Sequence, residues 1–230
     1  MISYNKNIDV ILLCGGKGQR LRPHTINIPK PLLLVNKKPF LYYMIKKFLR
    51  LNVNQIILAA GYKSNKVSIF VKKYFKNNKK IKLVDSGDVD IVKRIQDCSK
   101  YIKNDFFICY GDTYVNFDLN KYITNFKKKN KIAYVLGTFF RMKYGTISFN
   151  KKTKLVTEFN EKPLIPEPIN LGYFLIKKDL IPMINNHKSW LSFVQKLSKS
   201  RKLNIKITDK KYFSFDSPRE YQEVKTKFIN

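Results

Sequence analysis

The sequence predicts an α/β protein with a three-layer, doubly wound, mostly parallel (mixed) sheet flanked by helices. Residues 8–140 alternate short β-branched runs with longer amphipathic segments, a pattern typical of repeated βα units. The chain has 230 residues, of which 44% are hydrophobic and 14% aromatic, enough to build one substantial core. We therefore expect a single domain over residues 1–230, made of the halves 1–140 and 141–230.

Five apolar runs in the first half predict strands, and three amphipathic stripes between them predict helices. The runs cover residues 10–13, 55–60, 81–84, 105–110 and 132–139. In each stripe the apolar residues recur at offsets of three and four, which places them on one helix face. The stripes cover residues 40–51, 67–75 and 91–102. We expect their aliphatic and aromatic side chains to pack in the core.

The second half predicts shorter strands and two further helices. Strands are expected over residues 145–149, 155–159, 171–176 and 203–208. Pro163, Pro166 and Pro168 exclude a long helix, because each proline removes a backbone donor and restricts the residue before it. Helices are expected over residues 190–198 and 217–228. Ser217 is the expected N-cap of the second helix, with Pro218 in its first turn.

Charge is the most extreme feature of the composition. The chain has 46 Lys and Arg against 16 Asp and Glu, a formal net charge of +30. The lysines are spread over the whole length, which favours solvated surfaces as their place. A basic field that attracts anionic substrates is a second interpretation. A basic nucleic-acid-binding protein without catalysis is the alternative from another functional class.

Targeting signals and cysteine usage predict a cytoplasmic protein. No run approaches the roughly 20 apolar residues that span a bilayer, and residues 1–9 lack the apolar stretch of a secretion signal. We therefore expect no membrane contact. The three cysteines are widely spaced in apolar sequence, which predicts reduced thiols in the core rather than a disulfide or a zinc site.

A glycine-rich segment follows the first predicted strand. Gly15, Gly16 and Gly18 lie within four positions. Glycines let a backbone approach a ligand closely and direct N–H groups at phosphate. A simple tight turn is the alternative for these glycines taken alone. Further along the chain Lys30 stands between two prolines, whose fixed backbone reduces the entropy lost in aiming a cation at the loop.

The strings GGKGQRL, PKPLL and KPFL, in this order, resemble the N-terminal signature of the sugar-1-phosphate nucleotidyltransferases, also called NDP-sugar pyrophosphorylases. The resemblance implies a Rossmann-like, GT-A-like nucleotidyltransferase domain. Residues 1–140 are then the nucleotide-binding half and residues 141–230 the sugar-binding half. Arg20 and Lys30 are implied as catalytic cations. Nucleotide contacts are implied for Leu13, Cys14, Gly15, Gly16, Gly18, Gly87, Asp88 and Gly111.

Two acidic residues match the metal ligands of that family. Asp112 follows Gly111 at the end of a predicted strand, where ligands of open α/β sheets bind. Asp216 lies just before the last predicted helix, where an N-cap is the alternative interpretation. Carboxylates beside a polyphosphate suit Mg²⁺. The resemblance therefore implies Asp112 and Asp216 as ligands of a Mg²⁺ cofactor.

Three short strings in the second half match sugar-binding elements of the family: a Tyr-Gly pair, a Glu-Lys-Pro element and an Asn-x-Gly string. They imply substrate contacts by Tyr144, Gly145, Glu161, Lys162, Asn170 and Gly172. The implied reaction is in-line attack of a sugar 1-phosphate oxygen on the α-phosphorus of an NTP, with release of pyrophosphate. NTP and sugar 1-phosphate are then the partners, without nucleic acid, and a homo-oligomer is one possibility.

Two departures from the family pattern bear on specificity. Residues 85–91 lack the glycine-rich loop that contacts the base in many relatives, and Leu171 replaces the usual Gly or Ala. The strings LCGG and KPFL and the chain length resemble the D-glycero-D-manno-heptose 1-phosphate guanylyltransferases, the subtype we prefer. Residues 85–88 resemble the glucose-1-phosphate cytidylyltransferases, the alternative subtype. A degenerate binding or regulatory member is a further alternative, which the intact charged motif residues oppose.

Overall fold

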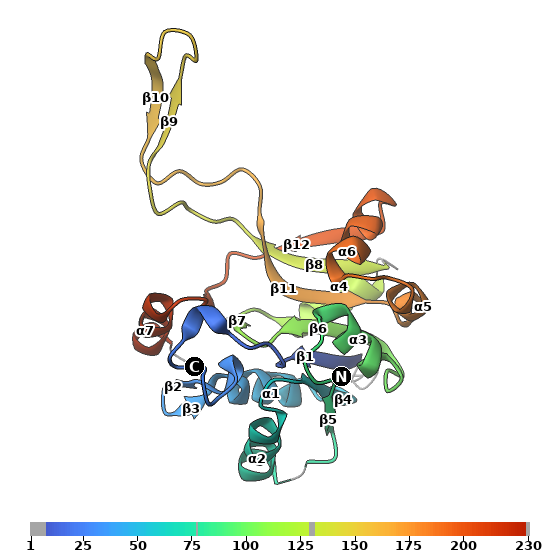
Figure 1. Cartoon of the computed structure of the whole chain (residues 1–230). Helices are drawn as coiled ribbons and strands as arrows, with labels where there is room; N and C mark the ends of the chain where they lie inside the picture. The colour runs from blue at the N-terminus through green and yellow to red at the C-terminus, as the bar shows by residue number, and fades with distance from the viewer. Residues whose placement is uncertain (1–7, 77, 129–131, 229–230) are drawn as a thin grey trace.

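A computed structural model describes residues 8–76, 78–128 and 132–228. Its centre is a seven-stranded sheet in the order β12-β8-β11-β6-β1-β4-β5 (Figure 1). Neighbouring strands are parallel except where β11 pairs with β8 and β6, so the mostly parallel, mixed sheet is confirmed. The strands are β1 (Ile8–Leu13), β4 (Gln55–Ala60), β5 (Ile81–Asp85), β6 (Asp105–Tyr110), β8 (Ala133–Thr138), β11 (Ile169–Ile176) and β12 (Leu203–Ile207).

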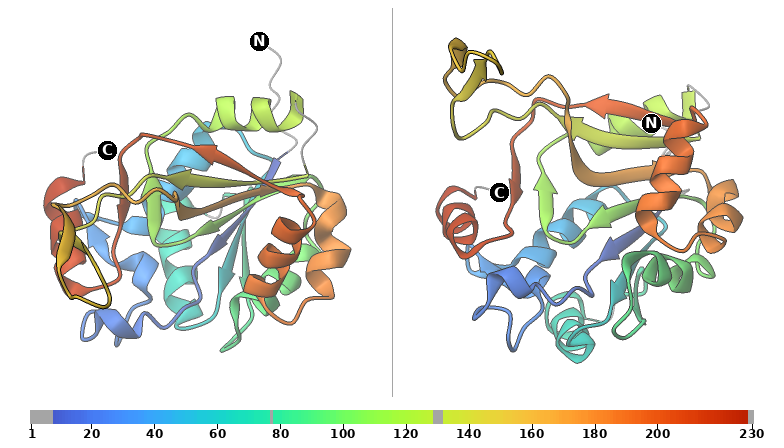
Figure 2. Two further views of the ribbon diagram at one scale, coloured as in Figure 1. Left: turned by 90° about the horizontal axis from the view of Figure 1, so that it is seen from above. Right: turned by 45° about the horizontal axis from the view of Figure 1, so that its top comes forward.

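Helices cover both faces of the sheet and complete the three layers (Figure 2). On one face pack α1 (Phe40–Arg50), α2 (Ser64–Phe75), α4 (Leu119–Lys128) and α7 (Pro218–Lys227). On the other face pack α3 (Ile91–Ser99), α5 (Ile181–Asn185) and α6 (Trp190–Lys199). The strand β11 lies between β8 and β6, so the sheet joins residues of both sequence halves.

Alternation along the central strand divides the core between the two faces. In β1, Val10 and Leu12 pack with the α1 side, whereas Ile11 packs with the α3 side, and all three are fully buried. Successive side chains of a strand point to opposite faces, so a strand covered by helices on both faces is apolar throughout. This burial positions the segment that follows Leu13 at the carboxyl edge of the sheet.

Several short elements are absent from the sequence-based expectations. The helices α4 and α5 are not predicted, nor are the small antiparallel pairs β2 (Leu34–Val35) with β3 (Lys38–Pro39) and β7 (Thr113–Val115) with β13 (Tyr212–Ser214). In α4 the buried residues Leu119, Tyr122, Ile123 and Phe126 recur at offsets of three and four, a helical stripe that the sequence-based expectations overlooked. The helix expected over 91–102 ends at Ser99, where the backbone makes tight turns.

The expected cap of α7 and the expected buried cysteines are confirmed. Ser217 caps α7, because its side chain accepts a hydrogen bond from the Glu220 N–H, and Pro218 is the first helical residue. Cys14, Cys98 and Cys109 are free and buried. No helix in the part of the chain that the structure describes is long and apolar enough to cross a bilayer.

A two-stranded ribbon projects from the body of the molecule. It consists of β9 (Thr146–Phe149) and β10 (Val156–Asn160), and it stands clear of the sheet and its helices (Figure 1). Both strands were expected from the sequence, each within one residue of its observed start and end. Their separation from the central sheet was not.

Candidate active site

A cavity of about 870 Å³ opens at the carboxyl edge of the sheet. It lies where β1 and β6 end, which is the usual ligand position in open α/β sheets. Its walls come from the glycine-rich segment after β1, the 3₁₀ helix Lys30–Leu32, the segment that leads into α3, and the start of α6. Asp112 and Asp216 close it at one side.

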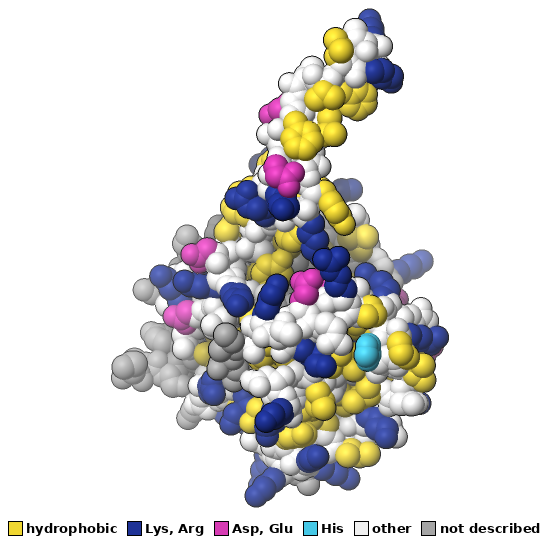
Figure 3. All heavy atoms as spheres, turned by 90° about the vertical axis from the view of Figure 1, so that its left-hand side faces the viewer, with side chains coloured by type: hydrophobic (Ala, Val, Ile, Leu, Met, Phe, Trp, Pro, Cys, Tyr) yellow, Lys and Arg dark blue, Asp and Glu magenta, His cyan; other side chains and the backbone are white. Residues whose placement is uncertain are grey.

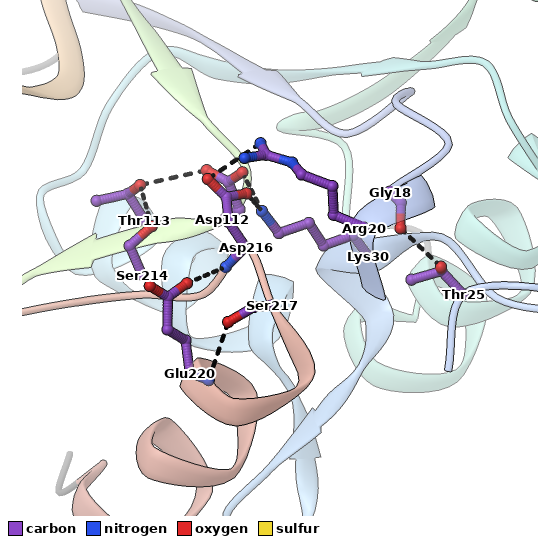
Figure 4. A network of polar contacts seen from close by, with 10 residues as sticks. All are labelled: Gly18, Arg20, Thr25, Lys30, Asp112, Thr113, Ser214, Asp216, Ser217 and Glu220. Carbon is purple, nitrogen blue, oxygen red and sulfur yellow. Dashed lines mark hydrogen bonds and ion pairs between the residues drawn. The ribbon is translucent and has the colours of Figure 1, made fainter. Parts of the chain in front are cut away.

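Four charged side chains meet at that side of the cavity. The Lys30 Nζ lies 2.5 Å from Asp112 Oδ2 and 2.5 Å from Asp216 Oδ1. The Arg20 Nη2 lies 3.2 Å from Asp216 Oδ2. Figure 4 shows Lys30 reaching both carboxylates, with Arg20 alongside. Asp112 and Asp216 lie 82 and 186 positions after Lys30 in the chain, and both contact its ammonium group.

The local sequence explains how Lys30 is held. It begins a 3₁₀ helix with Pro31 inside the first turn, and its side chain is only 9% exposed. Pro31 also packs near Gly111, where an added Cβ would lie 3.2 Å from its Cγ and 2.3 Å from the Leu13 carbonyl oxygen. Gly111 donates its N–H to that same carbonyl at 2.9 Å. Glycine at 111 is thus required for Asp112 to follow β6 so close to β1.

Asp216 is brought to the cavity by pairing of β13 with β7. In this pair Ser214 stands opposite Thr113, the residue next to Asp112. Behind Asp216, its N–H donates to Glu220 Oε2 at 2.8 Å while Ser217 caps the helix. The N-cap alternative for Asp216 is therefore wrong, because Ser217 occupies that role and the Asp216 carboxylate turns toward Lys30.

The cations change the acidity of Asp216. Partial burial acts to raise the pKa of its carboxyl group, but the hydrogen bond and charge of Lys30 and the charge of Arg20 outweigh burial. The pKa of Asp216 is therefore below its usual value, and the carboxylate is ionised at neutral pH. Two carboxyl groups held by cations are an electrostatic arrangement suited to a polyphosphate with a metal ion.

The glycine-rich segment forms the neighbouring wall. Gly18 has a φ of +59°, a left-handed conformation that favours glycine, and its carbonyl accepts a 2.8 Å hydrogen bond from the Thr25 hydroxyl. Across the mouth, Lys17 Nζ pairs with Asp88 Oδ2 at 2.6 Å. Of the expected nucleotide contacts, Gly87 does not line the cavity; those that do are Leu13, Cys14, Gly15, Gly16, Gly18, Asp88 and Gly111.

Arg94 is a cavity residue that sequence reasoning missed. It is 5% exposed, and its guanidinium donates to the Ala60 carbonyl at 3.1 Å and to the Val89 carbonyl at 2.6 Å. Among the described residues no carboxylate lies within 4.0 Å of it. Arg94 lies three residues after Ile91 and four before Cys98, within the apolar stripe predicted for residues 91–102. A cation on a helix face that packs in the core was therefore the available signal.

The position of Arg94 also explains why glycine is required at positions 15 and 61. A Cβ on Gly15 would lie 1.8 Å from Arg94 Nη1, and a Cβ on Gly61 would lie 2.0 Å from the same atom. The guanidinium thus fills the space beneath the glycine-rich segment. It ties the end of β4 to the residues that enter α3, in the region where the sequence lacks a glycine-rich loop. Other unpredicted lining residues are Tyr110, Val89, Asp90, Ser189 and Trp190.

The six expected sugar contacts do not line this cavity. Tyr144, Gly145, Glu161 and Lys162 lie at the base of the projecting ribbon; the Tyr144 side chain is 75% exposed, and Lys162 Nζ lies 3.5 Å from Glu161 Oε1. Asn170 and Gly172 lie in β11, behind a wall residue of the cavity: a Cβ on Gly172 would lie 2.6 Å from the Tyr110 ring. The structure brings the charged cluster together and leaves these six outside it.

Comparison with known proteins agrees with this geometry. The family model described as nucleotidyl transferase matches residues 9–213. The chain belongs to the nucleotidyl transferase family. The predicted family is therefore confirmed, and the Rossmann-like fold class with it.

Relatives of this nucleotidyl transferase include several that act on sugar 1-phosphates. The D-glycero-alpha-D-manno-heptose 1-phosphate guanylyltransferase of Campylobacter jejuni is 29% identical over 217 residues, covering 93% of this chain and 97% of the relative. The glucose-1-phosphate cytidylyltransferase of Salmonella typhimurium is 27% identical, covering 76% and 77%. The crystal structure of HddC from Yersinia pseudotuberculosis is 25% identical with a TM-score of 0.74, covering 96% and 99%.

Proposed function

We propose that the protein transfers a nucleoside monophosphate from an NTP to a sugar 1-phosphate and releases pyrophosphate. One observation carries this proposal: Lys30 and Arg20 converge with Asp112 and Asp216 beside a glycine-rich segment. The reaction requires two polyanions to be aligned while charge builds on the α-phosphate and on the leaving pyrophosphate. The relatives named above carry out reactions of this class according to their names.

The acidic pair fits a Mg²⁺ ion. Both carboxylates approach a single point, the Lys30 ammonium, and carboxylate oxygen is the ligand that Mg²⁺ prefers. The described residues contain no cluster of three or more His, Cys, Asp or Glu side chains that could hold a metal. Two carboxylates with substrate phosphates completing the shell is the usual arrangement for this ion. Asp112 and Asp216 would hold it, and it would make the phosphorus more electrophilic.

Lys30 and Arg20 would contact different phosphates of the substrates. Lys30 is buried and aimed at the carboxylates, so it would contact the α-phosphate and the sugar phosphate at the reacting end. The Arg20 side chain is 77% exposed, which suits the outer phosphates that leave as pyrophosphate. Backbone N–H groups of Gly15, Gly16 and Gly18 would contact the nucleotide.

The sugar would approach from the side of the projecting ribbon. Lys143, at its base, lies 3.7 Å from Glu220 Oε1, and Glu220 accepts the Asp216 N–H. Two contacts therefore connect the ribbon base to the reacting end of the cavity. This proximity supports Glu161 and Lys162 as contacts to sugar hydroxyls and sugar phosphate. Tyr144, Gly145, Asn170 and Gly172 remain proposals of the same kind.

For the base and the acceptor we favour GTP and a heptose 1-phosphate. The similarity to the guanylyltransferase covers nearly all of both chains, whereas that to the cytidylyltransferase covers about three quarters of each. The alternative is CTP and glucose 1-phosphate. It is favoured by the string at 85–88, in which Asp85 Oδ1 accepts the Gly87 N–H at 3.0 Å and orders the turn beside the cavity.

A pyrophosphate-release screen tests the proposal. GTP, CTP, UTP, ATP and dTTP are crossed with heptose, glucose and mannose 1-phosphates in the presence of Mg²⁺, and GTP with heptose 1-phosphate is expected to turn over fastest. Asp112→Asn removes one ligand charge and is expected to lower kcat at least ~10²-fold while the unfolding temperature is kept. Near wild-type turnover by this variant would overturn the metal assignment. Absence of release with every pair, together with tight salt-sensitive RNA binding, would favour the nucleic-acid alternative.

A further inference from the structure

The projecting ribbon is the outer part of a longer structure, residues 140–165, which we call the arm. Backbone hydrogen bonds join its two strands near the body and again in the ribbon: Met142 donates to Pro163, Ile165 donates to Phe140, Arg141 forms a bridge with Leu164, and β9 pairs with β10. At the tip, the Asn150 side chain accepts the N–H groups of residues 152 and 153. The arm is therefore an ordered, paired element and not a loose loop.

The strand register gives the arm one apolar and one polar face. Side chains of directly paired residues lie on the same face, and neighbours along a strand alternate. The pairs Phe149 with Val156 and Ile147 with Phe159 therefore form one face, which is wholly apolar. The pairs Ser148 with Glu158 and Thr146 with Asn160 form the other, which is wholly polar.

A bulge contributes to this segregation. The register shifts between Val156 and Glu158: Glu158 pairs with Ser148, and Val156 pairs with the next residue, Phe149. Residue 157 is the extra residue of the bulge. A β-bulge inserts one residue and re-aims the side chains on one side of it. Val156 thereby joins the apolar face. A surface ribbon that served only as a solvated loop would need no such arrangement.

Within the described chain the apolar face is largely uncovered, apart from Lys154 Nζ, which lies 5.7 Å from the Phe149 ring centroid. Ile147, Phe149, Val156 and Phe159 are 56%, 49%, 61% and 63% exposed, and the neighbouring Leu155 is 68% exposed. Figure 3 shows apolar side chains gathered along the arm, with basic side chains at its outer end. A two-stranded ribbon is at best marginally stable by itself in water, and large exposed apolar patches generally mark interaction sites.

We propose that the arm is a dimerisation element, in which the apolar face of one copy packs face to face on the same apolar face of a second copy. The two ribbons run in opposite directions about a two-fold axis. Such an interface is self-complementary, since each copy offers the same residues to the other. The proposal does not depend on the proposed activity.

Charge favours a second copy in this orientation. The four paired residues of the apolar face carry no charge, and Lys154 lies over Phe149 at the tip end of that face. Lys151 and Lys152 also lie at the tip. Ribbons that run in opposite directions hold the lysine clusters of the two copies at opposite ends of the interface. Because the arm stands clear of the body, the two strongly basic bodies need not meet closely.

The size of the face sets the expected strength. Aromatic side chains bury about 150–250 Å² each in full, and the four paired residues are about half exposed, so two such faces remove on the order of 800 Å² from water in total. This lies below the usual range for a stable interface. We therefore expect a reversible dimer whose fraction rises with protein concentration.

Sedimentation velocity over a concentration series tests the proposal with a matched pair of variants. Phe149→Lys and Ser148→Lys introduce the same charge at adjacent positions on opposite faces. Phe149→Lys is expected to give the 27.2 kDa monomer at all concentrations, and Ser148→Lys to dimerise as the wild type does. A monomeric wild type, or an equal loss of dimer in both variants, would overturn the proposal.

Cross-linking gives a second readout that does not require a destabilising charge. The native cysteines are all buried, so an introduced cysteine is the accessible thiol. A bis-maleimide is expected to join Ile147→Cys into dimers and to leave Ser148→Cys monomeric. Equal cross-linking of the two variants would contradict the assigned face. Binding of monomeric wild type to phosphatidylglycerol vesicles, lost in Phe149→Lys, would assign the face to a lipid surface instead and overturn the proposal.

Discussion

Gly61 and Gly16 show how the same residue type serves two purposes beside one cavity. An added Cβ on Gly61 would lie 2.0 Å from Arg94 Nη1 and 2.3 Å from the Gly87 carbonyl oxygen. An added Cβ on Gly16 would meet no atom within 4 Å. Gly61 is thus required by packing around a buried guanidinium, whereas Gly16 leaves open space in the cavity wall. The glycine-rich appearance of this region therefore reflects Arg94 as well as the expected ligand.

We predict that Gly61→Ala destabilises the protein and that Gly16→Ala does not. In Gly61→Ala the backbone carbonyl of Gly87 cannot be displaced as easily as a side chain, so the overpacking should cost about 1–3 kcal/mol. Urea unfolding followed by circular dichroism measures the difference. If both variants unfold at the same urea concentration, the packing role of Arg94 beneath the glycine-rich segment is wrong.

At the scale of elements, α1 is joined to β7 by a partly buried lysine. Lys47 donates to the Val115 carbonyl, and its ammonium lies 4.8 Å from the Phe117 ring centroid. Burial lowers the pKa of Lys47 from 10.5 to about 8. The strand β7 in turn pairs with β13 and carries Thr113 next to Asp112. Lys47 therefore holds β7 against α1, and β7 with β13 brings Asp112 and Asp216 together.

We predict a pH dependence of stability that requires Lys47. Its pKa is lower in the folded protein, so between about pH 8 and 10.5 the unfolded chain binds more protons at this site. Stability should therefore rise with pH across this window through Lys47, and this contribution should be absent in Lys47→Met. Unfolding free energies at pH 7.5 and 9.5 for both proteins measure the difference. Parallel changes in the two proteins would exclude a depressed pKa.

At the scale of the whole molecule, the formal charge of the chain differs from the formal charge of the cavity lining. The cavity wall contains four cations, Lys17, Arg20, Lys30 and Arg94, and four anions, Asp88, Asp90, Asp112 and Asp216. The lining is thus neutral in formal charge, while the chain carries +30. Attraction of a polyanionic substrate from a distance must then come from the rest of the surface. This supports steering as a consequence of the lysine excess.

We predict that salt weakens substrate capture more than it slows turnover. The field of the whole molecule is screened over a Debye length of about 8 Å at physiological salt, whereas the buried contacts of Lys30 are screened much less. Raising the NaCl concentration should lower kcat/KM for the NTP about tenfold or more and change kcat little. Steady-state kinetics over a salt series measures both. Equal losses in both parameters would count against steering.

Sequence reasoning predicted the parts of the fold that repeat a simple pattern. The inner strands β1, β4 and β6 are fully buried or nearly so, and the apolar residues of α1, α2 and α3 recur at helical offsets, so local pattern suffices for them. It did not predict α4, α5 or the pair β7 with β13. The elements α5, β7 and β13 have only 5, 3 and 3 residues, and their stability comes from contacts with residues distant in the chain. The helix α4 does have a local apolar stripe, which was overlooked.

By itself, the sequence predicted the family and the fold class, and it named Arg20, Lys30, Asp112 and Asp216 as candidate site residues. Motif strings and hydrophobic periodicity are local features, so they can be recognised without the tertiary structure. Only the tertiary structure decided that Lys30 joins Asp112 to Asp216 and that Arg94 fills the space beneath the glycine-rich segment. It also decided that four of the six expected sugar residues lie at the base of the arm, whereas Asn170 and Gly172 lie in β11. Contacts between distant residues depend on how β strands pair, and strand pairing is a property of the whole chain.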